Sequence, residues 1–286
     1  MINKEIVVSI CVITYNHEPY IADTIEGVLM QKTNFPLELV IGEDCSTDRT
    51  REICIKYKEK YPGIKLNLPE RNLGAIPNFI LNLKACTGKY IALCEGDDYW
   101  TDPLKLQKQV DFLESNPDYS LCYHNALIKY EGVKGKDKLF CDNTHEGTMD
   151  IQNVIKGVGM PTASMLFRTE ALEIPEWLKH IYNGDYALQL ILANKGKVKY
   201  LDKIMSVYRI QPGGLNSTMK NAIIQQRIIE LMNYFNIHTS FRYKDLVDHK
   251  TNMIFKDYPF QVLCGKTRLH RLFTALYWKR RLQKLF

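Results

Sequence analysis

Short, nearly continuous apolar runs alternate with amphipathic segments over the first hundred residues, and this alternation restricts the possible folds more than any other feature of the chain. The apolar runs are Ile6–Ile13, Leu37–Ile41 and Tyr90–Cys94. The helical patterns between them lie at about residues 18–31, 48–60 and 74–86. Strands without polar alternation are buried on both faces, and strands that alternate with helices form right-handed parallel crossovers. The sequence therefore predicts an α/β domain with a mostly parallel sheet flanked by helices.

The rest of the chain is less regular. A further helix is predicted from Thr101-Asp102-Pro103, a cap residue with a first-turn proline, to just before Pro117. Apolar residues at helical spacing predict a later helix over residues 217–236. We therefore expect one large domain, residues 1–210, followed by a helical C-terminal extension, residues 211–286.

The formal net charge of +6 is concentrated at one end of the chain. Residues 258–286 contain seven Lys or Arg residues and no Asp or Glu, so the remainder is close to neutral. Nucleic-acid-binding proteins spread basic residues over a groove or face, so this distribution argues against a nucleic-acid partner. The basic tail, with Trp278 to Arg281, is expected either to make peripheral contact with an anionic membrane or to be solvated.

The cysteines and the hydropathy indicate the compartment. The eight cysteines are scattered singly, with no CxxC pair, which favours free thiols over a disulfide framework or a zinc site. No stretch reaches the roughly 18 uncharged apolar residues of a membrane-spanning helix, and the N-terminus lacks the pattern of a secretion signal. We expect a cytoplasmic chain, with the inner face of the cell membrane as the place of any membrane contact.

Polar and acidic residues follow three of the predicted strands at the point where each strand ends. They are Thr14 to Glu18, Glu43 to Asp48, and Glu95 to Trp100. Because the carboxyl ends of parallel strands meet at one edge of a sheet, these clusters converge in space. The sequence therefore predicts a binding site at this edge.

The adjacent carboxylates Asp97 and Asp98 suit a divalent cation. Two neighbouring carboxylates repel each other and need a cation or hydrogen-bond donors to stay ionised. Mg²⁺ or Mn²⁺, bound by oxygens and still open to phosphates, meets that requirement. The alternative is a solvated helix cap, although Asp102 already offers one.

The second acidic cluster mixes structural and binding candidates. Asp48 or Ser46 is expected to cap the helix that follows. Asp44 lies closer to the end of the strand and is free to accept a hydrogen bond from a ligand N–H, such as a nucleobase imide.

Five ordered segments of the chain match one family. They read VSICVITYNHEPYIADTIEGVLMQ, LVIGEDCSTDRT, ERNLGAIPNF, GKYIALCEGDDYWTDP and NGDYAL. Together they resemble the family 2 glycosyltransferases of bacterial surface-polysaccharide synthesis, which are inverting enzymes with the nucleotide-sugar-binding GT-A fold. The resemblance implies a nucleotide-binding half at about residues 1–117 and an acceptor-side half at about residues 118–210. It also implies a nucleotide-sugar donor, with UDP the best guess, and a saccharide or lipid-linked acceptor.

The resemblance implies roles for matching positions. The expected nucleotide-binding residues are Thr14, Tyr15, Asn16, Glu18, Asp44, Arg71, Asn72, Gly74, Asn78 and Asp97. Asp98 matches the metal ligand and Asp185 the general base. The family's ARN triplet reads Ile76-Pro77-Asn78 here, so no contact is assigned to its arginine, and the role of Glu95 is left open.

Several other positions have two interpretations. Asp185 is either the base or a helix cap, and Arg209 either reaches the diphosphate or is a surface residue. Trp100 either lines the sugar pocket or covers the core, and Thr162 is a weaker candidate for the acceptor side. His124 is expected to be a packed histidine rather than a ligand.

The chemistry of transfer supports the assigned roles. A divalent metal stabilises the charge that develops on the leaving diphosphate, and one carboxylate takes the proton of the acceptor hydroxyl. Two alternatives share the fold: a non-catalytic nucleotide- or sugar-binding module, and a sugar-phosphate nucleotidyltransferase. The latter is expected to have a Gly-rich, basic phosphate loop near the N-terminus, and SICVITYNHEP contains no Gly, Lys or Arg.

Overall fold

A computed structural model of the chain describes residues 5–141, 147–212 and 221–258. The chain divides into two compact units, Met1–Ser217 and Thr218–Phe286. The first unit contains the sheet and every predicted site residue, and the second contains two helices. Each unit is described by itself.

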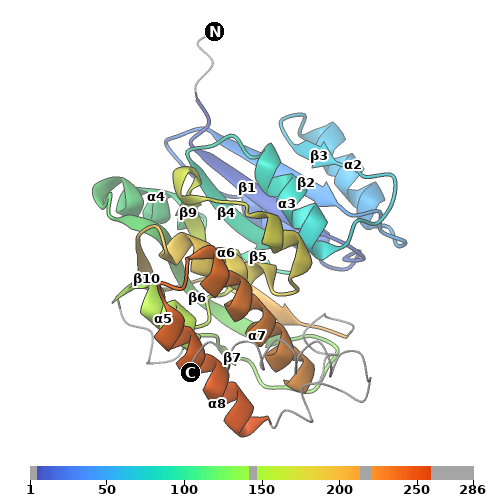
Figure 1. The fold of residues 1–286 in the computed structure, drawn as a ribbon. Helices are drawn as coiled ribbons and strands as arrows, with labels where there is room; N and C mark the ends of the chain where they lie inside the picture. The colour runs from blue at the N-terminus through green and yellow to red at the C-terminus, as the bar shows by residue number, and fades with distance from the viewer. Residues whose placement is uncertain (1–4, 142–146, 213–220, 259–286) are drawn as a thin grey trace. The chain divides into compact units, whose positions relative to one another are not determined.

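The first unit is built on one sheet of ten strands (Figure 1). The main path runs β3-β2-β1-β4-β9-β6-β10-β5, with β7 beside β6 and β8 beside β10. The strands are β1 (Val8–Thr14), β2 (Leu37–Glu43), β3 (Lys65–Asn67), β4 (Tyr90–Glu95), β5 (Tyr99–Trp100), β6 (Tyr119–Tyr130), β7 (Lys138–Leu139), β8 (Thr148–Met149), β9 (Leu166–Arg168) and β10 (Lys197–Ile210).

The long strands of the sheet are parallel, as the apolar runs predict. β1 pairs in parallel with β2 and β4, β2 with β3, and β6 with β10. The short strand β9 lies antiparallel between β4 and β6, a pairing that was not predicted from the sequence. Because β9 opposes both of its neighbours, β4 and β6 run in the same direction, so all the long strands end at one edge.

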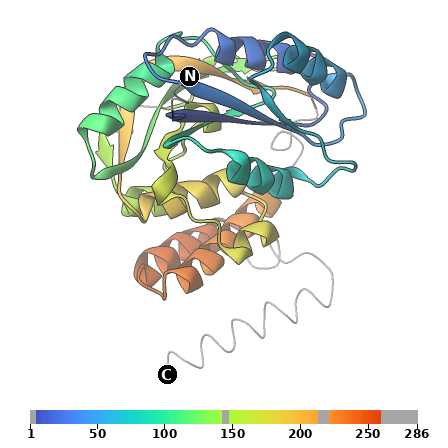
Figure 2. The same ribbon diagram turned by 90° about the horizontal axis from the view of Figure 1, so that it is seen from above.

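Helices cover both faces of the sheet (Figure 2). The three on one face are α1 (Ile21–Leu29), α2 (Thr50–Lys60) and α4 (Lys105–Ser115), and they share a buried apolar core with β1, β2 and β4. On the other side lie α3 (Ala75–Ala85), α5 (Ile151–Lys156) and α6 (Gly184–Ala193). The predicted helices of the first half are therefore confirmed to within a few residues.

The second unit is a pair of helices, α7 (Asn221–His238) and α8 (Lys244–Asp257). Ile229 packs against Ile254, and the rings of Phe235 and Tyr243 stack with their centroids 6.0 Å apart. The helix predicted over residues 217–236 matches α7. The basic tail lies outside the described residues. Within the described ranges, no helix combines the length and the apolar character that crossing a bilayer requires.

The described cysteines are free thiols, in agreement with the sequence prediction. Cys264 lies outside the described residues.

A lysine in the first turn of α4 is fully buried. Lys105 Nζ donates to Gln109 Oε1 at 2.7 Å and lies 4.0 Å from the centre of the Trp100 ring. Burial lowers the pKa of Lys105 to about 7, because the charged ammonium loses its hydration. The folded chain therefore releases a proton that the unfolded chain still binds between about pH 7 and pH 10.5.

This difference in proton binding predicts a pH-dependent effect of Lys105→Met. Stability rises with pH wherever the unfolded state binds more protons, by up to about 1.4 kcal/mol per pH unit for one proton. The free energy of unfolding of the wild type, measured relative to Lys105→Met by urea titration, should therefore increase from pH 7 to pH 9.5. Lys32→Met, at an exposed lysine, is the matched control and should show no such trend. A constant difference between wild type and Lys105→Met across this range would contradict the prediction.

Candidate active site

The site is built where the long parallel strands end. β1, β2 and β4 end at Thr14, Glu43 and Glu95, and β6 and β10 end at Tyr130 and Ile210. Because these strands are parallel, their carboxyl ends share one edge of the sheet. The convergence predicted from the sequence is therefore present.

The segment after β1 is tied to the segment after β2. Asn16, with φ of 55°, donates its backbone N–H to Ser46 Oγ and accepts from Thr47 N at 2.8 Å. Glu18 donates its backbone N–H to Asp48 Oδ2 at 3.0 Å, and Asp48 also accepts from the first-turn amide of α2. Asn16 and Glu18 thus brace two loops of the site, while Tyr15 leaves its ring 41% exposed above them.

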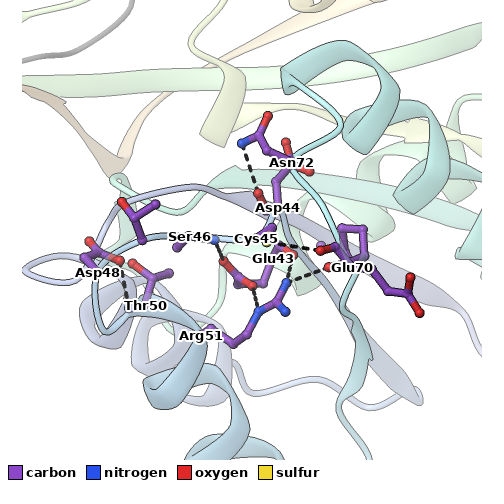
Figure 3. Close-up of polar contacts among 12 residues, drawn as sticks. Glu43, Asp44, Cys45, Ser46, Asp48, Thr50, Arg51, Glu70 and Asn72 are labelled. Atoms are coloured by element: carbon purple, nitrogen blue, oxygen red, sulfur yellow. Dashed lines mark hydrogen bonds and ion pairs between the residues drawn. The ribbon is translucent and has the colours of Figure 1, made fainter.

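Asp44 forms hydrogen bonds with the loop that precedes α3 (Figure 3). Its two carboxylate oxygens accept from the backbone amides of Leu73 and Gly74 at 2.8 and 2.9 Å. Asn72 Nδ2 donates to the Asp44 carbonyl at 3.0 Å. Gly74 has φ of 89°, a region that residues with a Cβ rarely adopt. The structure therefore brings together Asp44, Asn72 and Gly74, which the sequence places in one binding site.

Burial and hydrogen bonding have opposing effects on the pKa of Asp44. The residue is 2% exposed, and this burial raises the pKa of its carboxyl, while the two amide hydrogen bonds lower it.

The Arg71 side chain nearby is exposed. Asn78 is buried, and its Nδ2 donates to the Gly42 carbonyl of β2 at 3.0 Å. The amide of Asn78 thus secures α3 to the sheet in this structure.

An ion pair beneath this loop was not predicted from the sequence. Glu43 is fully buried, pairs with Arg51 Nε and accepts from Ser46 N at 2.7 Å (Figure 3). Arg51 also donates to the Pro69 carbonyl at 2.9 Å. The pair links β2, α2 and the segment between β3 and Asn72, so Glu43 is a structural residue beside Asp44.

The adjacent carboxylates Asp97 and Asp98 have different surroundings. Asp98 is 1% exposed, and its Oδ1 accepts from the backbone N–H of Arg209 at 2.9 Å. Its Oδ2 has no hydrogen-bond partner among the described residues. Asp97 is more accessible, with 21% of its side chain exposed. Its Oδ2 accepts from Gln211 Nε2 at 2.8 Å and lies 3.8 Å from His17 Nε2.

Glu95 lies in the field of two other acids. Burial and the charges of Asp97 and Asp185 raise the pKa of Glu95 to about 8, while a hydrogen bond from the Thr162 hydroxyl opposes the rise. Thr162, predicted to face the acceptor, therefore lies beside Glu95. The crowding of carboxylates at this edge keeps a proton on Glu95 near neutral pH.

Asp185 lies in the first turn of α6, on the face of the sheet opposite α1, α2 and α4. The N-cap position of α6 is Asn183, so Asp185 is not the cap residue. Burial raises the pKa of Asp185, and the backbone amides of Asp185 and Tyr186 lower it. The charge of Asp185 contributes to the raised pKa of Glu95, so α6 carries a carboxylate within electrostatic range of the end of β4.

Arg209 connects the acidic strand ends instead of standing free. Its side chain is 4% exposed, pairs with Asp23 and Glu131, and donates to the Asp97 carbonyl at 2.9 Å. The guanidinium also lies 4.3 Å from the centre of the Tyr99 ring. This buried position excludes the surface interpretation of Arg209, and its contact with the diphosphate stays a prediction.

Two further residues are packed. Trp100 is 2% exposed, and its indole N–H donates to the Ala163 carbonyl at 2.7 Å, so it covers the core. His124 is buried with Nδ1 2.8 Å from the Asn125 carbonyl, as expected for a packed histidine.

The sequence analysis missed His17 and Gln211 as neighbours of Asp97. His17 Nδ1 lies 3.2 Å from Thr14 Oγ1, which directs the ring toward β4. Its position inside the strand-end motif was a signal that could have been used. Gln211 gave no such signal, because only the pairing of β10 with β6 brings its amide to the site.

The donor set fits a hard divalent cation. Within the described part of the chain, Asp98 presents a buried oxygen without a hydrogen-bond partner, and the neighbouring carboxyl groups of Asp97 and Glu95 add further oxygens. Among the described residues, no three His, Cys, Asp or Glu side chains already form a metal-ligating group. The chemistry of the site therefore suits a cation, with Asp97 and Asp98 as the residues that would hold it.

Comparisons with known proteins identify the family and the fold of the chain. The family model described as glycosyl transferase family 2 matches residues 9–190. An uncharacterized protein of Mycobacterium tuberculosis is 36% identical over 210 residues, which cover 72% of the chain and 60% of that protein. The chain thus spans about three fifths of the length of this relative.

Two further proteins have descriptive names. WfaP of Escherichia coli, named UDP-Glc:alpha-D-GlcNAc-diphosphoundecaprenol beta-1,3-glucosyltransferase, is 29% identical and covers 77% of the chain and 83% of its own length. The crystal structure of Staphylococcus aureus TarS with UDP-GlcNAc has a TM-score of 0.69 at 20% identity, covering 93% of the chain and 78% of that structure. The likeness to TarS shows the GT-A fold.

The raised pKa of Glu95 predicts how the site affects stability. Between about pH 4.5 and pH 8 the folded chain holds a proton on Glu95 that the unfolded chain has lost, so the stability falls as pH rises, by up to about 1.4 kcal/mol per pH unit. Glu95→Gln should remove this decline in metal-free protein, as measured by urea unfolding between pH 5 and pH 8.

The matched control for this experiment is Glu59→Gln, at an exposed glutamate of α2. Glu59→Gln should keep the decline seen in the wild type. Parallel stability curves for wild type and Glu95→Gln would show that Glu95 is ionised in the folded chain.

Proposed function

The chain belongs to glycosyl transferase family 2, and on this premise we propose that it is an inverting glycosyltransferase that moves a sugar from a UDP-sugar to a lipid-linked saccharide. The observation that supports catalysis is the convergence of Glu95, Asp97 and Asp98 at the end of β4 with Asp185 from α6. A binding module needs the nucleotide loops of the site. It does not need a separate carboxylate delivered to them by a helix from the second half of the domain.

Asp185 is the proposed general base. As the acceptor oxygen forms its bond to the anomeric carbon, the hydroxyl proton passes to the Asp185 carboxylate, and the bond from that carbon to the donor diphosphate breaks. The raised pKa of Asp185 makes its carboxylate a stronger base than an exposed aspartate. One displacement with one base inverts the anomeric centre and needs no second nucleophilic carboxylate.

Asp97 and Asp98 are the residues proposed to hold Mn²⁺ or Mg²⁺. When bound, the cation would neutralise the charge that develops on the leaving diphosphate. Asp98 is held by the Arg209 backbone amide and would offer the cation its Oδ2, which has no partner among the described residues. The more accessible Asp97 would either bind the same cation or contact the ribose.

The nucleotide is proposed to lie over the loops after β1 and β2. Tyr15 presents an exposed ring there, and Asn16 and Glu18 fix the loop that carries it. Asp44 and Gly74 form the opposing wall, with Arg71 exposed beside it. UDP is the proposed nucleotide because TarS, which shares the fold, is seen with UDP-GlcNAc.

The acceptor and the setting follow from the relatives. WfaP is named for a diphosphoundecaprenol-linked acceptor, so we propose a lipid-linked saccharide and a role in surface polysaccharide synthesis. The enzyme would act in the cytoplasm at the inner face of the membrane. The nucleotidyltransferase alternative lacks support, because the loop after β1 contains no Gly, Lys or Arg.

Asp185→Asn should abolish transfer while leaving nucleotide binding intact. The amide cannot take a proton, so kcat should fall by about 10²–10⁴-fold. Sugar transfer from UDP-[¹⁴C]glucose and UDP-[¹⁴C]GlcNAc to a prenyl-diphosphate-linked GlcNAc is the measurement. Asp111→Asn, at an exposed aspartate of α4, is the control and should retain activity. Wild-type turnover by Asp185→Asn would refute its role as base.

UDP binding should depend on a divalent cation and on both strand-end carboxylates. UDP with Mn²⁺ at about 100 times Kd should stabilise the wild type by about 2.7 kcal/mol, measured by thermal unfolding. Asp97→Asn and Asp98→Asn should lose the Mn²⁺-dependent part of the shift, because each removes a charge from the cation site. A panel with GDP and CDP gives the nucleotide control. Absence of any nucleotide shift in the wild type would favour a different function.

A further inference from the structure

A lysine-rich loop lies at the same edge of the sheet as the acidic site. This lysine loop, residues 131–138, consists of the connection from β6 to β7 together with Lys138, the first residue of β7. It contains Lys134, Lys136 and Lys138, and all three side chains are exposed. None of them has an ion-pair partner within the part of the chain that the structure describes, unlike Lys129 at the end of β6, which pairs with Glu131 at 2.9 Å.

Three contacts fix the start of the lysine loop beside the site. Glu131 donates its backbone N–H to the Ile210 carbonyl at 2.9 Å, and its carboxylate lies 3.2 Å from Arg209 Nε. Arg209 in turn donates to the Asp97 carbonyl. A single side chain therefore separates the loop from the acidic strand end.

The remainder of the loop folds back over β6 and β10. A Cβ at Gly132 would lie 3.2 Å from Pro212 Cγ, and a Cβ at Gly135 would overlap the Tyr130 ring. Asp137 accepts from the Tyr130 backbone N–H at 3.2 Å, and Phe140 meets Tyr208 edge to face at 5.6 Å. These contacts keep the lysines at the sheet edge, on the acceptor-side half of the unit.

The acidic centre of the site and the lysine loop carry opposite charges. The centre of the site is acidic, with Glu95, Asp97, Asp98 and Asp185, and would repel any phosphate not shielded by a cation. Lysine ammonium groups are flexible point charges that bind phosphate oxygens well. Unpaired lysines beside an acidic centre therefore favour an anionic group that stays outside the reacting centre.

We propose that Lys134, Lys136 and Lys138 bind the diphosphate of a lipid-linked saccharide acceptor. This inference rests on the proposed function, since it assigns a binding site to the acceptor of that reaction. The saccharide end of the acceptor would face Asp185, and the phosphates would lie over the lysine loop. Selection for an acceptor with a diphosphate would then come from the loop, independently of the donor.

The test compares three proteins by isothermal titration calorimetry with farnesyl diphosphate. They are the wild type, the triple variant K134A/K136A/K138A, and the control triple variant K32A/K60A/K84A, which removes the same charge from exposed lysines elsewhere. We expect the loop variant to bind farnesyl diphosphate at least 10-fold more weakly and the control variant to match the wild type. Equal binding by the wild type and the loop variant would overturn the proposal.

Two further ligands separate the sources of phosphate. Farnesol should not bind, and inorganic pyrophosphate should bind no more tightly than farnesyl diphosphate. Binding of pyrophosphate without binding of farnesyl diphosphate would overturn the assignment to a lipid-linked ligand. Loop-dependent binding to phosphatidylglycerol vesicles, with no binding of farnesyl diphosphate, would replace the proposal with a membrane contact.

The UDP and Mn²⁺ thermal shift is measured on the same three proteins. It should be equal in all three, because the lysines are proposed to serve the acceptor. Loss of the UDP shift in the loop variant alone would assign the lysines to the donor and overturn the proposal. Loss of the UDP shift in the wild type as well would reject the proposed function, so the two failures are distinguishable.

Discussion

The crowding of carboxylates at the ends of buried parallel strands is the constraint on which this molecule depends. Glu95, Asp97 and Asp98 follow a strand that is buried on both faces, and α6 adds Asp185 to the same place. Partly desolvated like charges are unfavourable, so each must be protonated, hydrogen-bonded or paired. Glu95 is neutralised by a proton, because its pKa is raised to about 8. Asp98 accepts a hydrogen bond from a backbone amide, and Asp97 accepts one from a glutamine side chain.

The end of β10 provides much of this compensation. The Arg209 backbone amide holds Asp98, its guanidinium reaches the Asp97 carbonyl, and Gln211 holds the Asp97 carboxylate. A strand more than a hundred residues later in the chain therefore positions the acidic pair. Asp98 Oδ2 is still left without a hydrogen-bond partner among the residues that the structure describes, which is the feature that a bound cation would explain. Outside this acidic centre, the lysine loop carries positive charge, and we propose that its lysines bind phosphate.

Much of the fold was predictable because hydrophobic periodicity is a local property. The apolar runs and the amphipathic segments between them gave β1, β2, β4 and the helices that cover them. The antiparallel pairing of β9 was not predicted, because a three-residue strand between two parallel ones has no periodic signal from which its direction follows. In the site, Asp44 and Gly74 were grouped correctly from the family resemblance, and they meet through the Gly74 amide. Metal binding by Asp98 and base catalysis by Asp185 remain predictions.

The α/β class, the edge of the sheet at which the site lies and the residue types gathered there could be predicted from the sequence. They follow from strand order and from what comes directly after each strand. The contacts of each polar group, by contrast, depend on how distant segments pack together. That packing buries the Trp100 ring in the core, engages Arg209 with Asp23 and Glu131, and brings Gln211 to Asp97. The physical reason is that a side chain's role is set by its partners, and those partners come from strands and helices that no local pattern places side by side.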